Sequence, residues 1–238
     1  MEYMRTSEFP NRSVSESLTL TITREEVDAA CASEDPNKAL LDLLEKDLGD
    51  RLGASVGVWE GYTLREHLEM VLHQFDTYKA ESQSLPVDNN FFRVFLALHD
   101  IGKPDAVKRG EPPAKYIVPL ADTILEKLQY PAEKRVLAKA LLSKDYIGRH
   151  AKFGEPPEEV AHDIAQAAQE AGISASDFWK ILLAYFKFDA SSYTRDAGGK
   201  ESLDRLFRFD HEQGAIDFSP DLKVKIERLR GAIDKYER

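Results

Sequence analysis

The chain has 238 residues, 42% hydrophobic and 10% aromatic, so it can bury a sizeable core as one large domain or two small ones. Its 32 basic and 42 acidic side chains give a formal net charge of −10, which argues against long nucleic acids and anionic membranes as partners. Its one cysteine, Cys31, cannot form an internal disulfide, and neither a membrane-spanning run nor a signal peptide is evident. We therefore expect a cytoplasmic protein.

Residues 1–22 are predicted to form an N-terminal extension with one short strand. The first 13 residues are polar, whereas the stretch SLTLTIT, beginning at Ser17, alternates Leu18, Leu20 and Ile22 with polar residues. A period of two is typical of a half-buried strand. This is the one strand that the pattern predicts.

Residues 23–238 are predicted to form a single all-α domain of roughly nine helices. Apolar residues recur there at helical spacing, and capping residues or prolines mark the helix starts. The marked starts are Asp35-Pro36, Thr63 with Glu66, Asp88, Pro131, Ser174 with Asp177, and Ser219-Pro220. None of the Pro- and Gly-containing loops between them is typical of a domain linker.

The stretch FLALHDIGKP ends an almost wholly apolar helix with His99 and Asp100. Such a helix is expected to be buried on most sides. A buried carboxylate is costly without a cation or hydrogen-bond donors, so Asp100 should be paired, metal-bound or protonated. The same dipeptide at His162-Asp163 is not diagnostic, because His162 lies off the apolar stripe of its helix and should face solvent.

Two further polar residues border apolar stripes on other predicted helices. His67 lies on the helix that begins after Thr63, and Asp189 lies at the last turn of the helix DFWKILLAYFKFD. With His99 and Asp100 they supply two imidazoles and two carboxylates, a set suited to one divalent Mn, Fe, Co, Ni or Zn ion. The alternative is a buried polar cluster that is satisfied without a metal.

The order His67, His99-Asp100, Asp189 resembles the HD-domain superfamily of metal-dependent phosphohydrolases, over roughly residues 63–192. The resemblance implies an HD-like helical core, and the caps and helical spacing outside it predict additional helices at the N- and C-terminal ends. It also implies a metal held by these four residues and hydrolysis of a small phosphate ester, commonly a nucleotide or a nucleotide-like metabolite.

Two departures from the family pattern keep other functions open. Lys144 stands where binuclear members have a further histidine, with only His150 nearby, and Lys103 stands where some mononuclear nucleotidases have a glutamate. A non-catalytic sensor that binds metal and nucleotide is therefore the main alternative. An HD-type iron oxygenase is a second one, although it would need additional histidine ligands.

Asp100 and Lys103 are the predicted catalytic residues. Asp100 is expected to orient or deprotonate the attacking water as well as to bind the metal. Lys103 follows Gly102, which permits a sharp exit from the helix, and precedes Pro104, which prevents its continuation, so the ammonium is expected to meet a substrate phosphate. The alternative for Lys103 is a solvated lysine at a helix C-terminus.

Three more residues are predicted to contact the small phosphorylated substrate. Lys144 and Arg195 lie in segments that flank the later part of the motif and are expected to join a local basic rim. Tyr193 is expected to stack on the substrate or to donate a hydrogen bond to it. A plain surface charge is the alternative for each cation, and a buried, satisfied hydroxyl is the alternative for the tyrosine.

Overall fold

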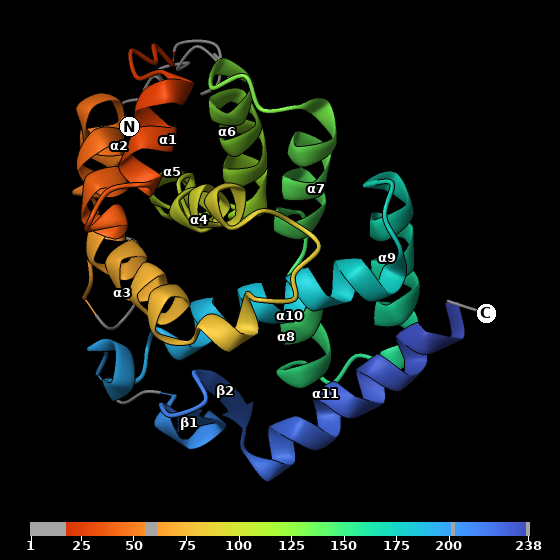
Figure 1. The fold of residues 1–238 in the computed structure, drawn as a ribbon. Coiled ribbons are helices and arrows are strands. Elements are labelled where there is room, and N and C mark those ends of the chain that lie inside the picture. Colours follow the sequence, from red (N-terminus) through yellow and green to blue (C-terminus); the bar gives the residue numbers. More distant parts are fainter. Residues whose placement is uncertain (1–17, 56–60, 201–202, 237–238) are drawn as a thin grey trace, which may run out of the picture.

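The computed structural model describes residues 18–55, 61–200 and 203–236, and this part of the chain is mostly helical (Figure 1). The α-helices are α1 (Arg24–Cys31), α2 (Pro36–Leu52), α3 (Leu64–Thr77), α4 (Asn89–Leu98), α5 (Lys103–Arg109), α6 (Ala114–Lys127), α7 (Ala132–Leu142), α8 (Tyr146–Ala151), α9 (Pro157–Glu170), α10 (Ala175–Ser191) and α11 (Pro220–Ile233). Single 3-10 turns are η1 (Lys79–Glu81), η2 (Arg195–Ala197), η3 (Asp204–Leu206) and η4 (Asp234–Tyr236), and the strands are β1 (Phe207–Asp210) and β2 (Ala215–Phe218). The all-α class is thereby confirmed.

Four of the six predicted helix starts are capped by side chains, as the sequence indicated. At α3 the Thr63 hydroxyl accepts from the backbone N–H of Glu66 at 3.2 Å, and the Glu66 carboxylate accepts from the N–H of Thr63 at 2.7 Å. Asp35, Asp88 and Ser174 likewise accept backbone N–H groups at the starts of α2, α4 and α10. These bonds lie within four residues of chain, so the local sequence is sufficient to specify them.

Helix α10 crosses the middle of the molecule and packs against α3 and α9 (Figure 1). Helix α4 packs against α3 and also against α1 and α2, while α11 lies along α8 and α9. One continuous hydrophobic cluster joins these layers and extends from Ile22 to Ile233. Elements from both ends of the described chain therefore share the core that surrounds α4 and α10.

The predicted N-terminal strand is wrong. Ser17 lies outside the described residues, and Leu18–Thr23 has no strand structure. The alternation in burial is present, because Ile22 is buried and the threonines between the apolar residues are exposed. The backbone N–H groups of Thr21 and Ile22 are satisfied by the Asp47 carboxylate of α2, at 2.6 and 3.0 Å, in place of a neighbouring strand.

The sheet of the described chain lies elsewhere, in a hairpin that the sequence analysis missed. Strands β1 and β2 pair antiparallel, with Phe207 opposite Phe218 and Asp210 opposite Ala215. The signal is present in FRFD, which alternates apolar and polar residues, and in the Ile-Asp-Phe that ends AIDF, on either side of a turn that contains Gly214 at φ +61°. The two four-residue strands are short enough for the surrounding helical pattern to mask that signal.

Candidate metal centre

His67 lies one turn into α3, on the face that packs into the core. The cap at Thr63 sets the start of the helix and with it the direction in which each later side chain points. Leu64 and Leu68 on this face are fully buried, and the imidazole itself has no exposed surface. His67, which was predicted to border an apolar face of its helix, is therefore fully buried.

His99 and Asp100 lie in the turn between α4 and α5. All residues from Phe91 to Leu98 are buried, as the apolar pattern predicted. Gly102 allows this turn to approach α6 closely, because a Cβ at this position would lie 2.4 Å from the backbone carbonyl carbon of Tyr116. A side chain at this position would therefore force the His-Asp turn away from α6.

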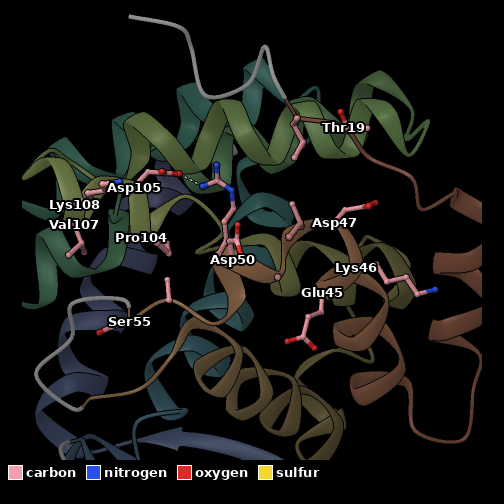
Figure 2. A pocket seen from close by; sticks show the side chains of 15 residues that line it. Thr19, Glu45, Lys46, Asp47, Asp50, Ser55, Pro104, Asp105, Val107 and Lys108 are labelled. Carbon is pink, nitrogen blue, oxygen red and sulfur yellow. Dashed lines mark hydrogen bonds and ion pairs between the residues drawn. The ribbon is translucent and has the colours of Figure 1, made fainter. Parts of the chain in front are cut away.

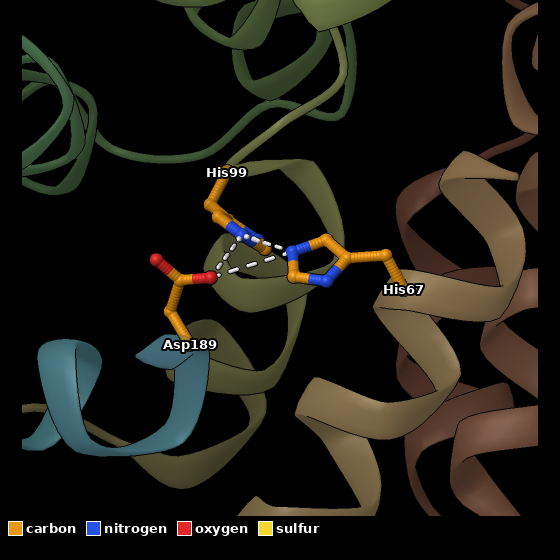
Figure 3. A group of neighbouring side chains, drawn as sticks. All are labelled: His67, His99 and Asp189. Carbon is orange, nitrogen blue, oxygen red and sulfur yellow. Dashed lines mark hydrogen bonds and ion pairs between the residues drawn. The ribbon is translucent and has the colours of Figure 1, made fainter. Parts of the chain in front are cut away.

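Side chains from α3, from the end of α4 and from α10 meet at one point (Figure 3). The Nε2 atoms of His67 and His99 are 3.3 Å apart. Oδ1 of Asp189 lies 3.3 Å from the first of these atoms and 3.4 Å from the second. The three atoms form a nearly equilateral triangle.

This triangle has the dimensions of a metal-binding face. Ligand atoms about 2.0–2.1 Å from a tetrahedral ion are about 3.3–3.4 Å apart, which matches all three edges. Within the described residues, His67, His99 and Asp189 form a group that could hold a metal ion. Asp100 adjoins it, with Oδ2 3.4 Å from Nε2 of His67 and 3.7 Å from Nε2 of His99.

The two imidazoles are oriented differently. Nδ1 of His99 donates to the backbone carbonyl oxygen of Leu96 at 2.6 Å, so in the neutral ring Nε2 presents its lone pair to the group. Such a bond to the second ring nitrogen is typical of a metal-binding histidine. His67 has no corresponding bond, because its buried Nδ1 finds no hydrogen-bond partner among the described residues.

Two helix ends face the centre. His99 is the C-cap residue of α4, and Asp189 lies in the last turn of α10. Helix C-termini carry a partial negative charge that favours nearby cations, typically by 0.3–1 kcal/mol per helix in exposed settings. The carboxylates and both helix ends therefore favour a positive charge at the same point.

The pKa values of the His/Asp centre depend on the charges of its own residues and on their burial. Burial lowers the pKa of His67, but hydrogen bonds and charges from Asp100 and Asp189 outweigh this effect and raise it to about 9. Burial raises the pKa of Asp189, yet bonds to His67 and His99 hold it well below its usual range. The pKa of Asp100 is likewise lowered, because His99, Lys103 and His67 overcome the effect of burial.

Lys103 contacts Asp100 directly, with Nζ 2.7 Å from Oδ2. It is not the last residue of α4 but the first residue of α5, and Pro104 follows as the second. Pro104 therefore lies in the first turn of a new helix. Proline is compatible with this position, because the N–H that it lacks would have no acceptor there. The solvated C-terminal lysine considered above is wrong, since 20% of the Lys103 side chain is exposed and it forms an ion pair.

Two tyrosines pack against the imidazoles. The Tyr193 ring stacks on His67, with centroids 5.0 Å apart and planes inclined by 21°. The Tyr185 ring meets His99 edge to face at 5.5 Å and 71°. Tyr193 was a predicted site residue. Tyr185 was not predicted as a site residue, although its spacing of four residues from Asp189 could have indicated a place beside the centre.

The predicted basic rim consists largely of paired cations. Lys144 lies 2.9 Å from Asp163, which also pairs with Arg149 at 2.6 Å. Arg195 pairs with Asp204 at 2.9 Å, next to β1. These contacts hold Lys144 and Arg195 on neighbouring carboxylates, and their role in substrate binding stays a prediction.

The other histidines that the sequence analysis weighed lie apart from the group. His162 is exposed on α9, as predicted, and its ring lies 6.1 Å from that of Tyr236, with the planes inclined by 49°. His150 directs Nδ1 to the carbonyl oxygen of Glu155 at 2.7 Å and does not join the three-residue group. The second His-Asp dipeptide therefore provides an internal comparison for the first.

A separate cavity of about 950 Å³ lies beside α5 (Figure 2). Pro104, Asp105 and Lys108 of α5 line it, together with the C-terminal part of α2, and Arg51 pairs with Asp105 at its edge. None of the three grouped ligand residues lines this cavity. It is adjacent to the helix that carries Lys103 but is distinct from the His/Asp centre.

Searches against protein families, curated proteins and solved structures found no match for this chain. The HD-domain resemblance accordingly rests on the ordered motif alone and stays an interpretation. In the described part of the chain, no helix combines the length and the apolar character required to cross a bilayer.

Proposed function

We propose that the protein is an HD-type metal-dependent phosphohydrolase that acts on a small phosphate ester, with a nucleotide or nucleotide-like metabolite as substrate. His67, His99, Asp100 and Asp189 would hold one divalent transition metal. Asp100 and Lys103 would serve the chemistry, and Tyr193 would contact the substrate.

The observation that carries the proposal is the triangle of two imidazole nitrogens and one carboxylate oxygen with edges of 3.3, 3.3 and 3.4 Å. Its mixed donor set suits Mn, Fe, Co, Ni or Zn. A lysine beside the fourth predicted ligand adds a positive charge that a phosphate would need. The Asp189 side chain is 33% exposed, so the centre can be approached from solvent.

Each group has a defined task in this chemistry. A bound divalent metal supplies Lewis acidity and lowers the pKa of a coordinated water towards about 7. The Asp100 carboxylate would orient or deprotonate that water. The Lys103 ammonium can turn from Asp100 to a phosphate oxygen and stabilise the charge that develops there.

The test combines metal analysis with a substrate screen. Wild-type protein loaded with Mn, Fe, Co, Ni or Zn is expected to bind one ion and to hydrolyse at least one nucleotide, cyclic nucleotide or sugar phosphate. His99→Ala should abolish stoichiometric metal uptake. Asp100→Ala and Lys103→Ala should reduce kcat/KM by about 100-fold or more, the usual effect of removing a transition-state contact.

His162→Ala is the matched control, because it alters the same dipeptide on the exposed face of α9. It should retain both metal and activity. Activity that survives Asp100→Ala undiminished would place the chemistry elsewhere, and unchanged turnover in Lys103→Ala would remove the phosphate-binding role of that residue.

A non-catalytic sensor is the second candidate, favoured by the ion pair between Lys103 and Asp100. An ammonium 2.7 Å from Oδ2 lowers the basicity of the carboxylate that would have to accept a proton. Tight nucleotide binding by the metal-loaded protein, with no turnover under any of the five metals, would identify a sensor.

A further inference from the structure

His67 differs from His99 in what orients its ring. The bond from Nδ1 of His99 to the carbonyl oxygen of Leu96 fixes the plane of that imidazole and the edge that faces the centre. His67 is fully buried, and its Nδ1 atom has no hydrogen-bond partner among the described residues. A hydrogen bond behind the ring therefore does not set the orientation of His67.

The carboxylates of the centre select one edge of the His67 ring. Nε2 of His67 lies 3.3 Å from Oδ1 of Asp189 and 3.4 Å from Oδ2 of Asp100, so this nitrogen faces the centre. In any histidine, Nε2 lies close to the Cβ–Cγ axis about which the ring turns, and this torsion is a soft one. Contacts at that atom alone therefore constrain the plane of the ring only weakly.

The ring of Tyr193 supplies a contact with the face of the imidazole. The two centroids are 5.0 Å apart and the planes are inclined by 21°, within the range of stacked aromatic pairs. A phenol against this face opposes rotation of the imidazole out of its plane. The Tyr193 ring also packs against a small buried cluster of Tyr62, Met70 and Ala197, which supports it.

The backbone of Tyr193 lies in a closed turn that follows α10. The N–H of Thr194 donates to the carbonyl oxygen of Ser191 at 3.1 Å, and the N–H of Gly199 donates to the carbonyl oxygen of Thr194 at 2.7 Å. Gly199 approaches so closely that a Cβ there would lie 2.5 Å from the carbonyl carbon of Tyr193. These contacts restrict the backbone that carries the phenol ring, so the ring can act as a fixed surface for His67.

We propose that Tyr193 is a positioning residue, which holds the plane of the His67 imidazole by stacking where His99 uses a hydrogen bond. The lone pair of Nε2 lies in the ring plane, so fixing the plane fixes the direction in which the neutral ring offers it. The role rests on the proposed function, because it needs a metal ion at the His/Asp centre. It uses the ring and not the hydroxyl, and is therefore separate from the substrate contact proposed for the same residue.

The test compares two variants of the full chain in calorimetric binding of Co²⁺, with no substrate added. Tyr193→Leu removes the ring and should weaken Co²⁺ binding by about tenfold or more, the usual effect of losing a group that orients a metal-binding histidine. Tyr193→Phe keeps the ring and should bind Co²⁺ as the wild type does. If Tyr193→Leu does not fold, Tyr193→Met takes its place, because a flexible thioether fills the space without a ring.

The visible spectrum of bound Co²⁺ adds a readout that a loss of packing elsewhere would not change, because its d–d bands depend on the arrangement of the ligands. The spectra of wild type and Tyr193→Phe should coincide, and the bands of Tyr193→Leu should differ. Tyr236→Leu is the matched control, because its ring lies 6.1 Å from that of His162 in the second His-Asp pair. It should alter neither Co²⁺ affinity nor the spectrum.

The failures of the two proposals are distinguishable. Equal Co²⁺ affinity and equal spectra in wild type and Tyr193→Leu would overturn the positioning role and leave the proposed function intact. An equal loss of affinity in Tyr193→Leu and Tyr193→Phe would also overturn it, because the hydroxyl would then be the group that matters. If the wild type binds neither Co²⁺ nor any of the other four metals, both proposals fail together.

Discussion

His67 combines complete burial with a pKa raised to about 9. In the metal-free protein its imidazolium therefore balances the Asp100 and Asp189 carboxylates at neutral pH. A metal ion needs the neutral imidazole, so the proton and the metal compete for the same nitrogen. The one residue thus links metal binding, pH and stability.

The metal-free protein should become less stable between pH 6.5 and pH 9. The pKa of His67 is raised on folding, so its stabilising contribution is complete below about 6.5 and is lost as the pH rises through about 9. A shift of this size corresponds to at most roughly 3 kcal/mol. Urea unfolding in the presence of a chelator at several pH values measures it.

The metal-loaded protein should show the opposite trend, because fewer protons compete for Nε2 of His67 at higher pH. His67→Gln is the control, and its metal-free stability should vary much less over the same range. A wild-type protein whose metal-free stability is constant from pH 6.5 to 9 would contradict the assigned ionisation.

At the scale of elements, the end of α10 is tied to α3 by buried polar groups. Nε2 of Gln74 donates to the Ser191 hydroxyl at 2.9 Å, and Gln74 has no exposed surface. Ser191 follows Asp189 by two residues, and Gln74 follows His67 by seven on the same helix. This contact therefore sets the distance between two of the three grouped ligand residues. The Oε1 atom of Gln74 has no hydrogen-bond partner among the described residues. A buried amide oxygen without a partner lowers stability, so stability alone does not explain a glutamine at this position.

Gln74→Leu should weaken metal binding by about tenfold while changing the free energy of unfolding by no more than about 1 kcal/mol. An apolar side chain of similar size relieves the unpaired amide oxygen, which offsets the lost hydrogen bond, but it no longer anchors the end of α10. Metal titration and urea unfolding measure the two effects separately.

Gln166→Leu is the matched control, because Gln166 is exposed on α9 and donates a hydrogen bond to Glu170 one turn further along the same helix. It should alter neither quantity. Unchanged metal affinity in Gln74→Leu would show that α10 holds Asp189 in place without this contact.

At the scale of the whole molecule, helices near both ends of the described chain contribute to one core. Leu40 of α2 and Leu229 of α11 are both fully buried in the same hydrophobic cluster. The contacts that join them run through α3, α10 and α9. Such a cluster favours unfolding of the chain as one unit.

Leu40→Ala and Leu229→Ala should each destabilise the protein by about 2–5 kcal/mol, the range for a leucine removed from a packed core. Each should shift one common transition, followed both by far-ultraviolet circular dichroism and by release of bound metal. Val224→Ala, on an exposed position of α11, should shift it by less than about 0.5 kcal/mol. Two separate transitions, with only one moved by each variant, would divide the chain into two domains.

The sequence by itself determined the all-α class, the marked helix starts and the order of the candidate ligands. Caps such as Thr63 with Glu66 join residues three positions apart, and the apolar run that ends at His99 indicates its own burial. Both signals depend on short-range geometry. The expectation that His67 and Asp189 approach the His-Asp pair came from their places beside apolar faces.

Only the tertiary structure decided which side chains become the hydrogen-bond, ion-pair and ring partners of these elements. Asp47 accepts the backbone N–H of Thr21, where a strand was predicted. Asp100 pairs with Lys103 at the start of α5, a helix that the sequence did not predict. Tyr185 lies against His99. The hairpin at β1 and β2 is anchored by Glu81, which accepts the N–H of Ile216 from 135 residues away in the chain. Contacts of this kind depend on how helices pack in space, because a polar group takes whichever partner the fold brings within hydrogen-bond distance.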